Sequence, residues 1–172
     1  IVVPGEVRFF FSSRRRHTRS RDFPTTPSAY DRACGTDGNC NGAKGDAFVA
    51  LLTTSLSNLI ASTFVGGSGS DEPRAMALDL TRSTVYVVGI TDSTEFPTTP
   101  GAYDRSYNGG LHDIFLVALP LTLDILKAST FLGGDQNDDA CCVAMCGHEV
   151  CVAGYKEFLP QPHYPDQDVA IY

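Results

Sequence analysis

The sequence predicts an all-β protein built from repeated four-stranded units. Gly, Ser, Thr, Asp, Val and Tyr are plentiful, as in short strands joined by turns. Residues that favour helices are scarce, with two Met and few Lys or Glu. Several strings of residues occur twice in the same order, which is typical of a repeat architecture. With 42% hydrophobic residues and no apolar run of membrane-spanning length, the chain can bury a globular core.

The first 21 residues differ from the rest of the chain. Six of the 13 basic residues lie in the string RFFFSSRRRHTRSR from Arg8 to Arg21, whereas all but one of the 20 acidic residues follow it. The string resembles the conceptual translation of a sequencing adapter, and the repeat pattern begins only after it. We therefore expect residues 1–21 to be a disordered or artefactual basic tail. The acidic remainder argues against binding to nucleic acid or anionic lipid.

Three strings define the repeat. FPTTPSAYDR and FPTTPGAYDR begin at Phe23 and Phe96, DAFV and DIFL begin at Asp46 and Asp113, and STFVGG and STFLGG begin at Ser62 and Ser129. The second and third strings recur at the same interval, but the first recurs at a longer one. The stretch between Cys34 and Cys40 is therefore an insertion in the first copy.

Each copy contains four apolar runs separated by turn signals. In the first copy these runs are Ala47–Leu52, Leu59–Val65, Ala75–Leu80 and Val85–Ile90. The loop 66–73 separates the second and third runs, and its proline cannot donate a ladder hydrogen bond. The prolines of FPTTP predict an extended connector before each copy.

Four short strands repeated in series predict the blades of a β-propeller. A two-layer sandwich is the alternative, but a sandwich would not need the same connector twice. We predict two blades plus the start of a third of an incomplete β-propeller, over residues 22–95, 96–157 and 158–172. Because two blades cannot close a ring, the fragment alone should expose apolar surface and be aggregation-prone or poorly stable.

The strings resemble the repeats of the SBBP family of β-propeller proteins. The matching strings are FPTTPGAYDRSYNGG, DAFVALL, STFVGG, MALD and VYVVGIT, and the likeness covers about residues 22–172. The chain departs from the pattern at the Cys34–Cys40 insertion, at Leu51 where a lysine is usual, at residues 117–119 where that lysine is also absent, and at the string VAMC from Val143. The resemblance implies a secreted or cell-surface protein in which the propeller is a scaffold. It implies no shared reaction.

The six cysteines fall into two groups. Cys34 and Cys40 bracket a tight loop that a disulfide could close, and the even number suits an oxidising compartment. Cys146 and Cys151 flank a short turn, so they could face each other across a hairpin. Strand alternation places Cys142 and Cys146 on one face. Besides a disulfide, the alternatives are free packed cysteines and a zinc site, which would use Cys142, Cys146, His148 and Cys151 without the usual paired CxxC spacing.

Two Gly-rich loops carry clustered acids that could bind calcium. The weak candidates for ligands are Asp71, Glu72, Asp135, Asp138 and Asp139. Carboxylates on such loops suit a hard cation, but the residue order of an EF-hand is absent. We expect solvated connecting loops here, with no metal and no other cofactor. Asp46 and Asp113 occupy equivalent positions and are interpreted as acceptors that close a turn.

The sequence predicts a non-catalytic structural or interaction module. It contains no G-x-S-x-G or H-E-x-x-H motif, so we identify no catalytic residue. The expected partners are other blades of the parent chain and a protein or glycan, with no nucleic acid and no membrane span. One alternative is an accessory propeller of a secreted carbohydrate-active enzyme or protease whose catalytic residues lie elsewhere. Another is a calcium-dependent adhesin.

Overall fold

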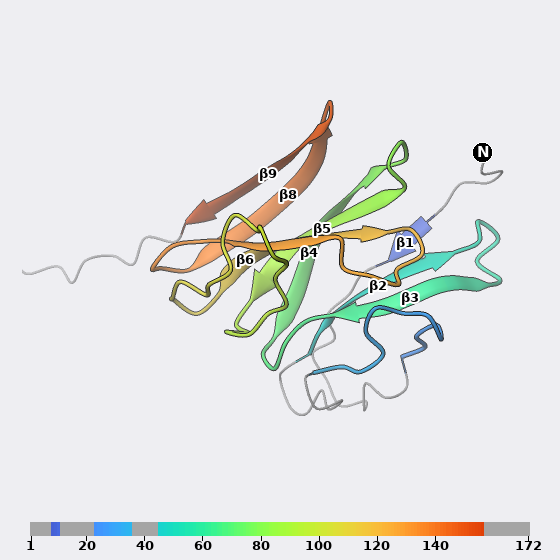
Figure 1. The fold of residues 1–172 in the computed structure, drawn as a ribbon, viewed down its shortest axis with the longest axis horizontal. Coiled ribbons are helices and arrows are strands. Elements are labelled where there is room, and N and C mark those ends of the chain that lie inside the picture. The colour runs from blue at the N-terminus through green and yellow to red at the C-terminus, as the bar shows by residue number, and fades with distance from the viewer. Residues whose placement is uncertain (1–7, 11–22, 36–44, 157–172) are drawn as a thin grey trace, which may run out of the picture.

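The computed structural model describes residues 8–10, 23–35 and 45–156 (Figure 1). These residues form strands and turns without a helix, which confirms the all-β prediction. The strands are β1 Arg8–Phe10, β2 Ala47–Leu52, β3 Leu59–Val65, β4 Asp71–Asp79, β5 Thr84–Thr91, β6 Asp113–Pro120, β7 Ala128–Leu132, β8 Asp138–Cys146 and β9 Glu149–Lys156. The predicted third copy, residues 158–172, lies outside the described residues.

The strands form three antiparallel sheets with the orders β1-β2-β3, β4-β5-β6-β7 and β8-β9. The four-stranded sheet takes β4 and β5 from the first sequence copy and β6 and β7 from the second. Neither copy therefore corresponds to one sheet. A periodic sequence has the same period from any starting point, so the strings do not reveal where one sheet ends and the next begins. The described residues form no closed sheet.

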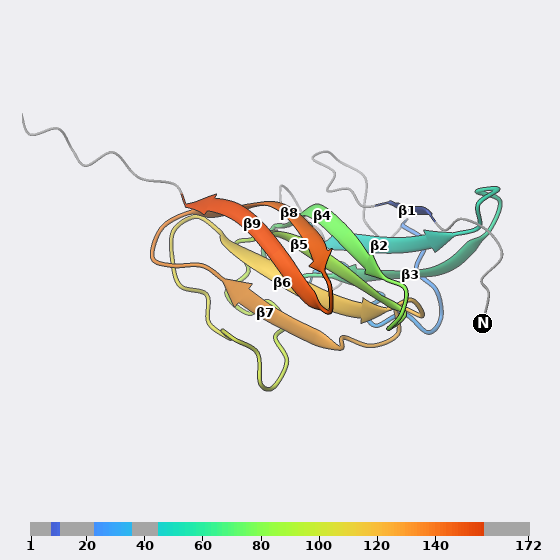
Figure 2. The same ribbon diagram turned by 90° about the horizontal axis from the view of Figure 1, so that it is seen from above.

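The four-stranded sheet lies between the other two sheets (Figures 1 and 2). Successive residues of a strand point to opposite faces. Val87 and Phe115 accordingly belong to a large apolar cluster shared with β2 and β3. Val88 and Leu116, one residue further along each strand, pack in a second cluster with Val143 of β8. This central sheet is therefore buried on both faces, as the near-continuous apolar runs of β5 and β6 require.

Strand β4 begins earlier than the sequence predicts. It includes Asp71 and Pro73, which the pattern assigns to a loop. The register shifts between Pro73 and Ala75, so Arg74 forms a β-bulge. Proline is tolerated at bulges and in edge strands because no ladder hydrogen bond is lost there, and β4 is an edge strand of its sheet.

Strand β1 pairs antiparallel with residues 50–52 of β2. The sequence predicts a disordered or artefactual basic tail over residues 1–21, so the strand β1 differs from the expected disorder. Its physical basis is that β2 would otherwise be an edge strand with unpaired backbone groups, which can template another strand. The remainder of the tail, residues 1–7 and 11–21, lies outside the described part of the chain.

The FPTTP connectors cover the edge strands β3 and β7. In the first copy, Thr26 N–H donates to Ser62 O at 3.2 Å and Phe64 N–H donates to Asp31 O at 3.0 Å. Thr63 Oγ1 also accepts from Asp31 N–H at 2.9 Å. The second connector repeats these bonds on β7 through Thr99, Asp104 and Thr130. The connector and STF strings therefore recur together because they are bonded to each other.

Candidate functional site

The strongest candidate site is a contact between the first connector and the β6–β7 turn. Tyr30 N–H donates to Leu123 O at 2.8 Å. Leu123 is 0% exposed and belongs to the large apolar cluster. Tyr30 is half-buried, and burial, followed by the charge of Asp31, raises the pKa of its phenol. The connector of the first sequence copy is therefore docked on the β6–β7 turn of the second copy.

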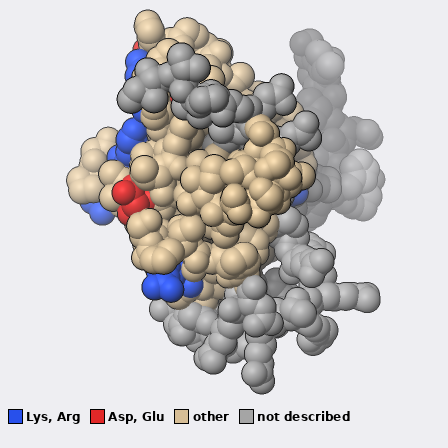
Figure 3. All heavy atoms as spheres, turned by 90° about the vertical axis from the view of Figure 1, so that its right-hand side faces the viewer, with Lys and Arg blue, Asp and Glu red and all other residues tan. Residues whose placement is uncertain are grey.

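The equivalent residues at the two ends of the described unit have no such cover. Tyr103, the counterpart of Tyr30, is 87% exposed. Leu56, the counterpart of Leu123, is 51% exposed, although both leucines have nearly the same left-handed φ of 57° and 54°. The β2–β3 turn that contains Leu56 lies on the side of the molecule drawn in Figure 3, where few charged side chains are visible among the coloured atoms. Leu56 is therefore an exposed apolar side chain in a turn whose other residues, 53–55, 57 and 58, are Thr, Ser and Asn.

A second repeated feature is a pair of buried carboxyl groups on either side of a glycine. Asp46 Oδ2 accepts from Gly35 N–H at 2.9 Å, and Asp71 Oδ2 accepts from Gly67 N–H at 2.9 Å. A Cβ on Gly66 would lie 2.5 Å from Asp46 Cγ and 2.6 Å from Asp71 Oδ2, so only glycine fits between them.

The second copy has the same arrangement around Gly133. Asn108 N–H donates to Asp113 Oδ2 at 2.6 Å, and Gly134 N–H donates to Asp138 Oδ2 at 2.7 Å. Asp113 therefore closes a short turn as interpreted, and Asp46 likewise accepts a backbone N–H, from Gly35, across a segment that includes residues outside the described ranges. The glycine between the carboxyls explains why the GG dipeptide recurs with them.

Burial changes the acidity of these carboxyl groups. It raises the pKa of Asp46 to about 7, against the hydrogen bond from Gly35, and the charge of Asp71 contributes further. Burial also raises the pKa of Asp71 to about 6, although hydrogen bonds from Thr91, Gly67 and Ser93 oppose this shift. The pKa of Asp113 is raised for the same main reason. Within the described part of the chain, Asp46 Oδ1 and Asp113 Oδ1 are buried without a hydrogen-bond partner, which favours the neutral acid.

The calcium candidates do not converge on one site. Asp71 accepts from Thr91, Ser93 and Gly67, and Asp138 accepts from Gly134. The other three candidates form ion pairs at 2.9 to 3.6 Å, namely Glu72 with Arg74, Asp135 with Lys156 and Asp139 with Arg74. Within the described ranges, no group of three or more His, Cys, Asp or Glu side chains is placed to hold a metal ion.

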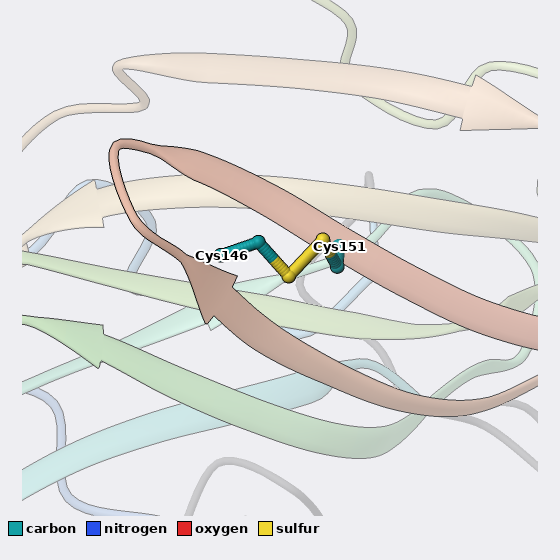
Figure 4. The surroundings of a disulfide bond; sticks show 2 residues. All are labelled: Cys146 and Cys151. Carbon is teal, nitrogen blue, oxygen red and sulfur yellow. A yellow bond between two sulfur atoms is a disulfide. The ribbon is translucent and has the colours of Figure 1, made fainter.

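The Cys146–Cys151 disulfide predicted across the β8–β9 turn is present (Figure 4). A disulfide sulfur is not a thiolate, so the alternative zinc site with these two cysteines is wrong. Cys34 is buried and its sulfur accepts from Asp46 N–H at 3.5 Å, whereas Cys40 lies outside the described residues. Cys142, Ala144 and Cys146 are exposed, whereas Val143 and Met145 between them are half-buried. Cys142 and Cys146 therefore lie on the same face of β8, as predicted.

No protein-family model matches the chain, and no curated protein sequence matches it. Over the described ranges, no helix has the length and apolar character that crossing a membrane requires.

Proposed function

We propose that the chain is a non-catalytic structural and interaction module, a β-propeller repeat segment of a secreted or cell-surface protein. Its first partners are further units of the same repeat, and the assembled surface binds a protein or glycan. The observation that carries this proposal is the Tyr30–Leu123 contact together with its uncovered counterparts, Tyr103 and Leu56.

Two properties of the unit support a scaffold. Its two ends, marked by Tyr103 and by Leu56, are complementary, because their counterparts Tyr30 and Leu123 already contact each other within the chain. Repeat units that bury their faces on their neighbours are the basis of solenoids and propellers. The repeated polar residues, including Asp46, Asp113 and Thr63, also have structural partners within the fold. A residue that recurs in each unit with a structural bond is better explained by folding than by catalysis.

The disulfide on the β8–β9 hairpin supports the secreted location, since such bonds persist in oxidising compartments. The acidic composition is compatible with the same location, and the net charge of −7 disfavours a nucleic-acid partner.

A matched pair of variants in the full chain tests the proposal. Sedimentation velocity over a range of concentrations measures self-association, and circular dichroism during urea titration measures the free energy of unfolding. We expect wild-type copies to associate head to tail. Tyr103→Ala should weaken this association about tenfold, or about 1.4 kcal/mol, and leave the stability unchanged.

Tyr30→Ala is the control, because Tyr30 stands in the same string but is already docked within the chain. It should lower the free energy of unfolding by roughly 2 kcal/mol, since the burial of its half-buried ring is lost while the backbone hydrogen bond to Leu123 O remains. A wild-type chain that stays monomeric at every concentration would refute the proposal. Equal effects of the two variants on association would do the same.

A further inference from the structure

Two neighbouring thiols lie on a bulge of β8. Adjacent residues in a regular strand point to opposite faces of the sheet. In β8 the register shifts between Ala140, which pairs with Gly154, and Cys142, which pairs with Ala153. Cys141 is the extra residue of this β-bulge, and bulges redirect side chains. As a result the Sγ atoms of Cys141 and Cys142 lie 3.2 Å apart.

Both thiols are free and exposed, whereas Cys146 and Cys151 on the same hairpin form a disulfide (Figure 4). The hairpin therefore holds one oxidised pair and one reduced pair. The reduced pair has only two sulfur ligands, and no third His, Cys, Asp or Glu side chain in the described part of the chain completes a metal site with it. Loss of two electrons to an external oxidant, with formation of an S–S bond, is therefore the chemistry open to this pair, rather than metal coordination.

The first copy indicates that the bulge stays accessible in a longer array. The equivalent bulge of β4 is formed by Arg74, and the β8–β9 hairpin packs against this part of the four-stranded sheet. Arg74 nevertheless remains exposed, with its guanidinium 3.2 Å from Asp139 of β8. Cys141 occupies the position of Arg74, so a following unit would leave its thiol within reach of a small reagent.

We propose that Cys141 and Cys142 form a redox-active dithiol that a small-molecule disulfide oxidises to a disulfide within the β8 bulge. This inference does not depend on the proposed scaffold function. One cysteine thiolate attacks a sulfur of the oxidant, whose S–S bond breaks, and one thiolate leaves. The second cysteine thiolate then attacks the protein sulfur of the mixed disulfide and releases the other half of the oxidant. Two electrons pass from the cysteine pair to the oxidant, and the two cysteine protons pass to the two released thiolates.

The geometry favours the second step. Holding two reacting groups together converts a bimolecular reaction into an intramolecular one, and the fold already brings the two sulfurs to 3.2 Å. The hydrogen bond from the Cys141 thiol to the Cys142 sulfur raises the pKa of Cys141. Because the thiolate is the nucleophile, oxidation should accelerate as the pH rises above neutrality.

The experiment treats the full, folded chain with glutathione disulfide and maps the product by mass spectrometry. The two methionines, Met76 and Met145, make this mapping direct. Cyanogen bromide cleaves after each methionine in acid, where thiol exchange is suppressed. The three fragments then each carry one cysteine pair: Cys34 with Cys40, Cys141 with Cys142, and Cys146 with Cys151.

We expect fragment 77–145 to lose two hydrogen atoms and to carry no glutathione. This closure should be about tenfold or more faster in the folded chain than in guanidinium chloride. Cys142→Ser and Cys141→Ser should each stop at the mixed disulfide. Phenylarsine oxide, which bridges neighbouring thiols, should bind the wild-type chain before oxidation, while the Cys146–Cys151 disulfide is intact, and should fail to bind either variant in the same state.

Three results would overturn the proposal. In the first, wild-type fragment 77–145 retains glutathione, so the second thiol does not resolve the mixed disulfide. In the second, fragment 77–145 is linked to fragment 146–172 or to a second chain, so that oxidation joins other pairs. The third is the absence of any reaction under conditions in which the unfolded chain is oxidised.

Discussion

Truncation of the two equivalent leucines tests whether the β6–β7 turn, which contacts Tyr30, is more stabilising than the exposed β2–β3 turn. Leu123→Ala and Leu56→Ala remove the same three carbon atoms from turns with the same backbone conformation, since both residues have φ near 55°. Any penalty for alanine in the left-handed region is therefore nearly equal in the two variants. The difference between them reports the burial that one turn gains from the neighbouring connector.

The magnitude follows from the exposed fractions. Leu123 is 0% exposed, and three buried carbon atoms at about 0.8 kcal/mol each contribute roughly 2.5 kcal/mol. The cavity left behind raises the expected loss to roughly 3–5 kcal/mol. Leu56 is 51% exposed, so its truncation should cost about 1 kcal/mol or less.

Urea unfolding followed by circular dichroism measures both losses. The m-value should remain constant, so that the midpoints report stability alone. On heating, Leu123→Ala should lower the Tm by roughly 10 °C, since a domain of this length loses about 2–4 °C per kcal/mol, whereas Leu56→Ala should shift it by a few degrees at most. Similar losses in the two variants would show that the turns are equally buried, and the reasoning from docked and open ends would fail.

Three further predictions concern the buried carboxyls and the β8–β9 hairpin. The pKa of Asp46 is raised in the folded chain from 3.8 to about 7, so its neutral form favours the fold, and this contribution of a few kcal/mol is lost as the pH rises from about 4 to about 7. Asp46→Asn should make stability fall less steeply with pH in urea titrations, the remaining slope coming from Asp71 and Asp113, whose pKa values are also raised; an unchanged slope would contradict it. Gly66→Ala should destabilise the chain by roughly 2–4 kcal/mol because its Cβ overlaps two carboxyls, whereas Gly134→Ala meets only the end of a lysine side chain at 3.1 Å and should have little effect; thermal melts that rank them in the opposite order would be decisive against the clash. Replacing Cys146 and Cys151 by serine should lower the stability of the hairpin by about 2 kcal/mol through loop entropy, seen as faster amide exchange in β8 and β9, and unchanged exchange would argue against that contribution.

The sequence predicts the strands well and their assembly poorly. The runs Ala47–Leu52 and Leu59–Val65 coincide with β2 and β3, because local alternation and turn signals determine where such strands begin and end. The Cys146–Cys151 bond is also foreseeable, since a short turn between two strands brings its flanks together. These features depend on a few consecutive residues.

Features that depend on distant partners are not visible in the strings. The bulge at Cys141 arises from the register between β8 and β9, and alternation within one strand gives no sign of it. The sequence suggests that the connectors are spacers, yet Thr26 and Asp31 form hydrogen bonds along the edge of β3. Leu56 and Leu123 hold equivalent places in the repeat and differ in burial, because among the described residues a connector docks on the turn of Leu123 alone.

The position of the sheet boundary gives this difference a structural meaning. Because the central sheet joins β4 and β5 of one copy to β6 and β7 of the next, each sequence copy belongs to two sheets at once. Successive sheets are linked through the chain and through apolar contacts between them. The two sequence copies are also joined by the pairing of β5 with β6, so they cannot separate without breaking these strand pairs. The Tyr30–Leu123 contact adds a third link between the same neighbours. In the proposed scaffold, the exposed Tyr103 and Leu56 would be the two places where further units dock, one in each direction.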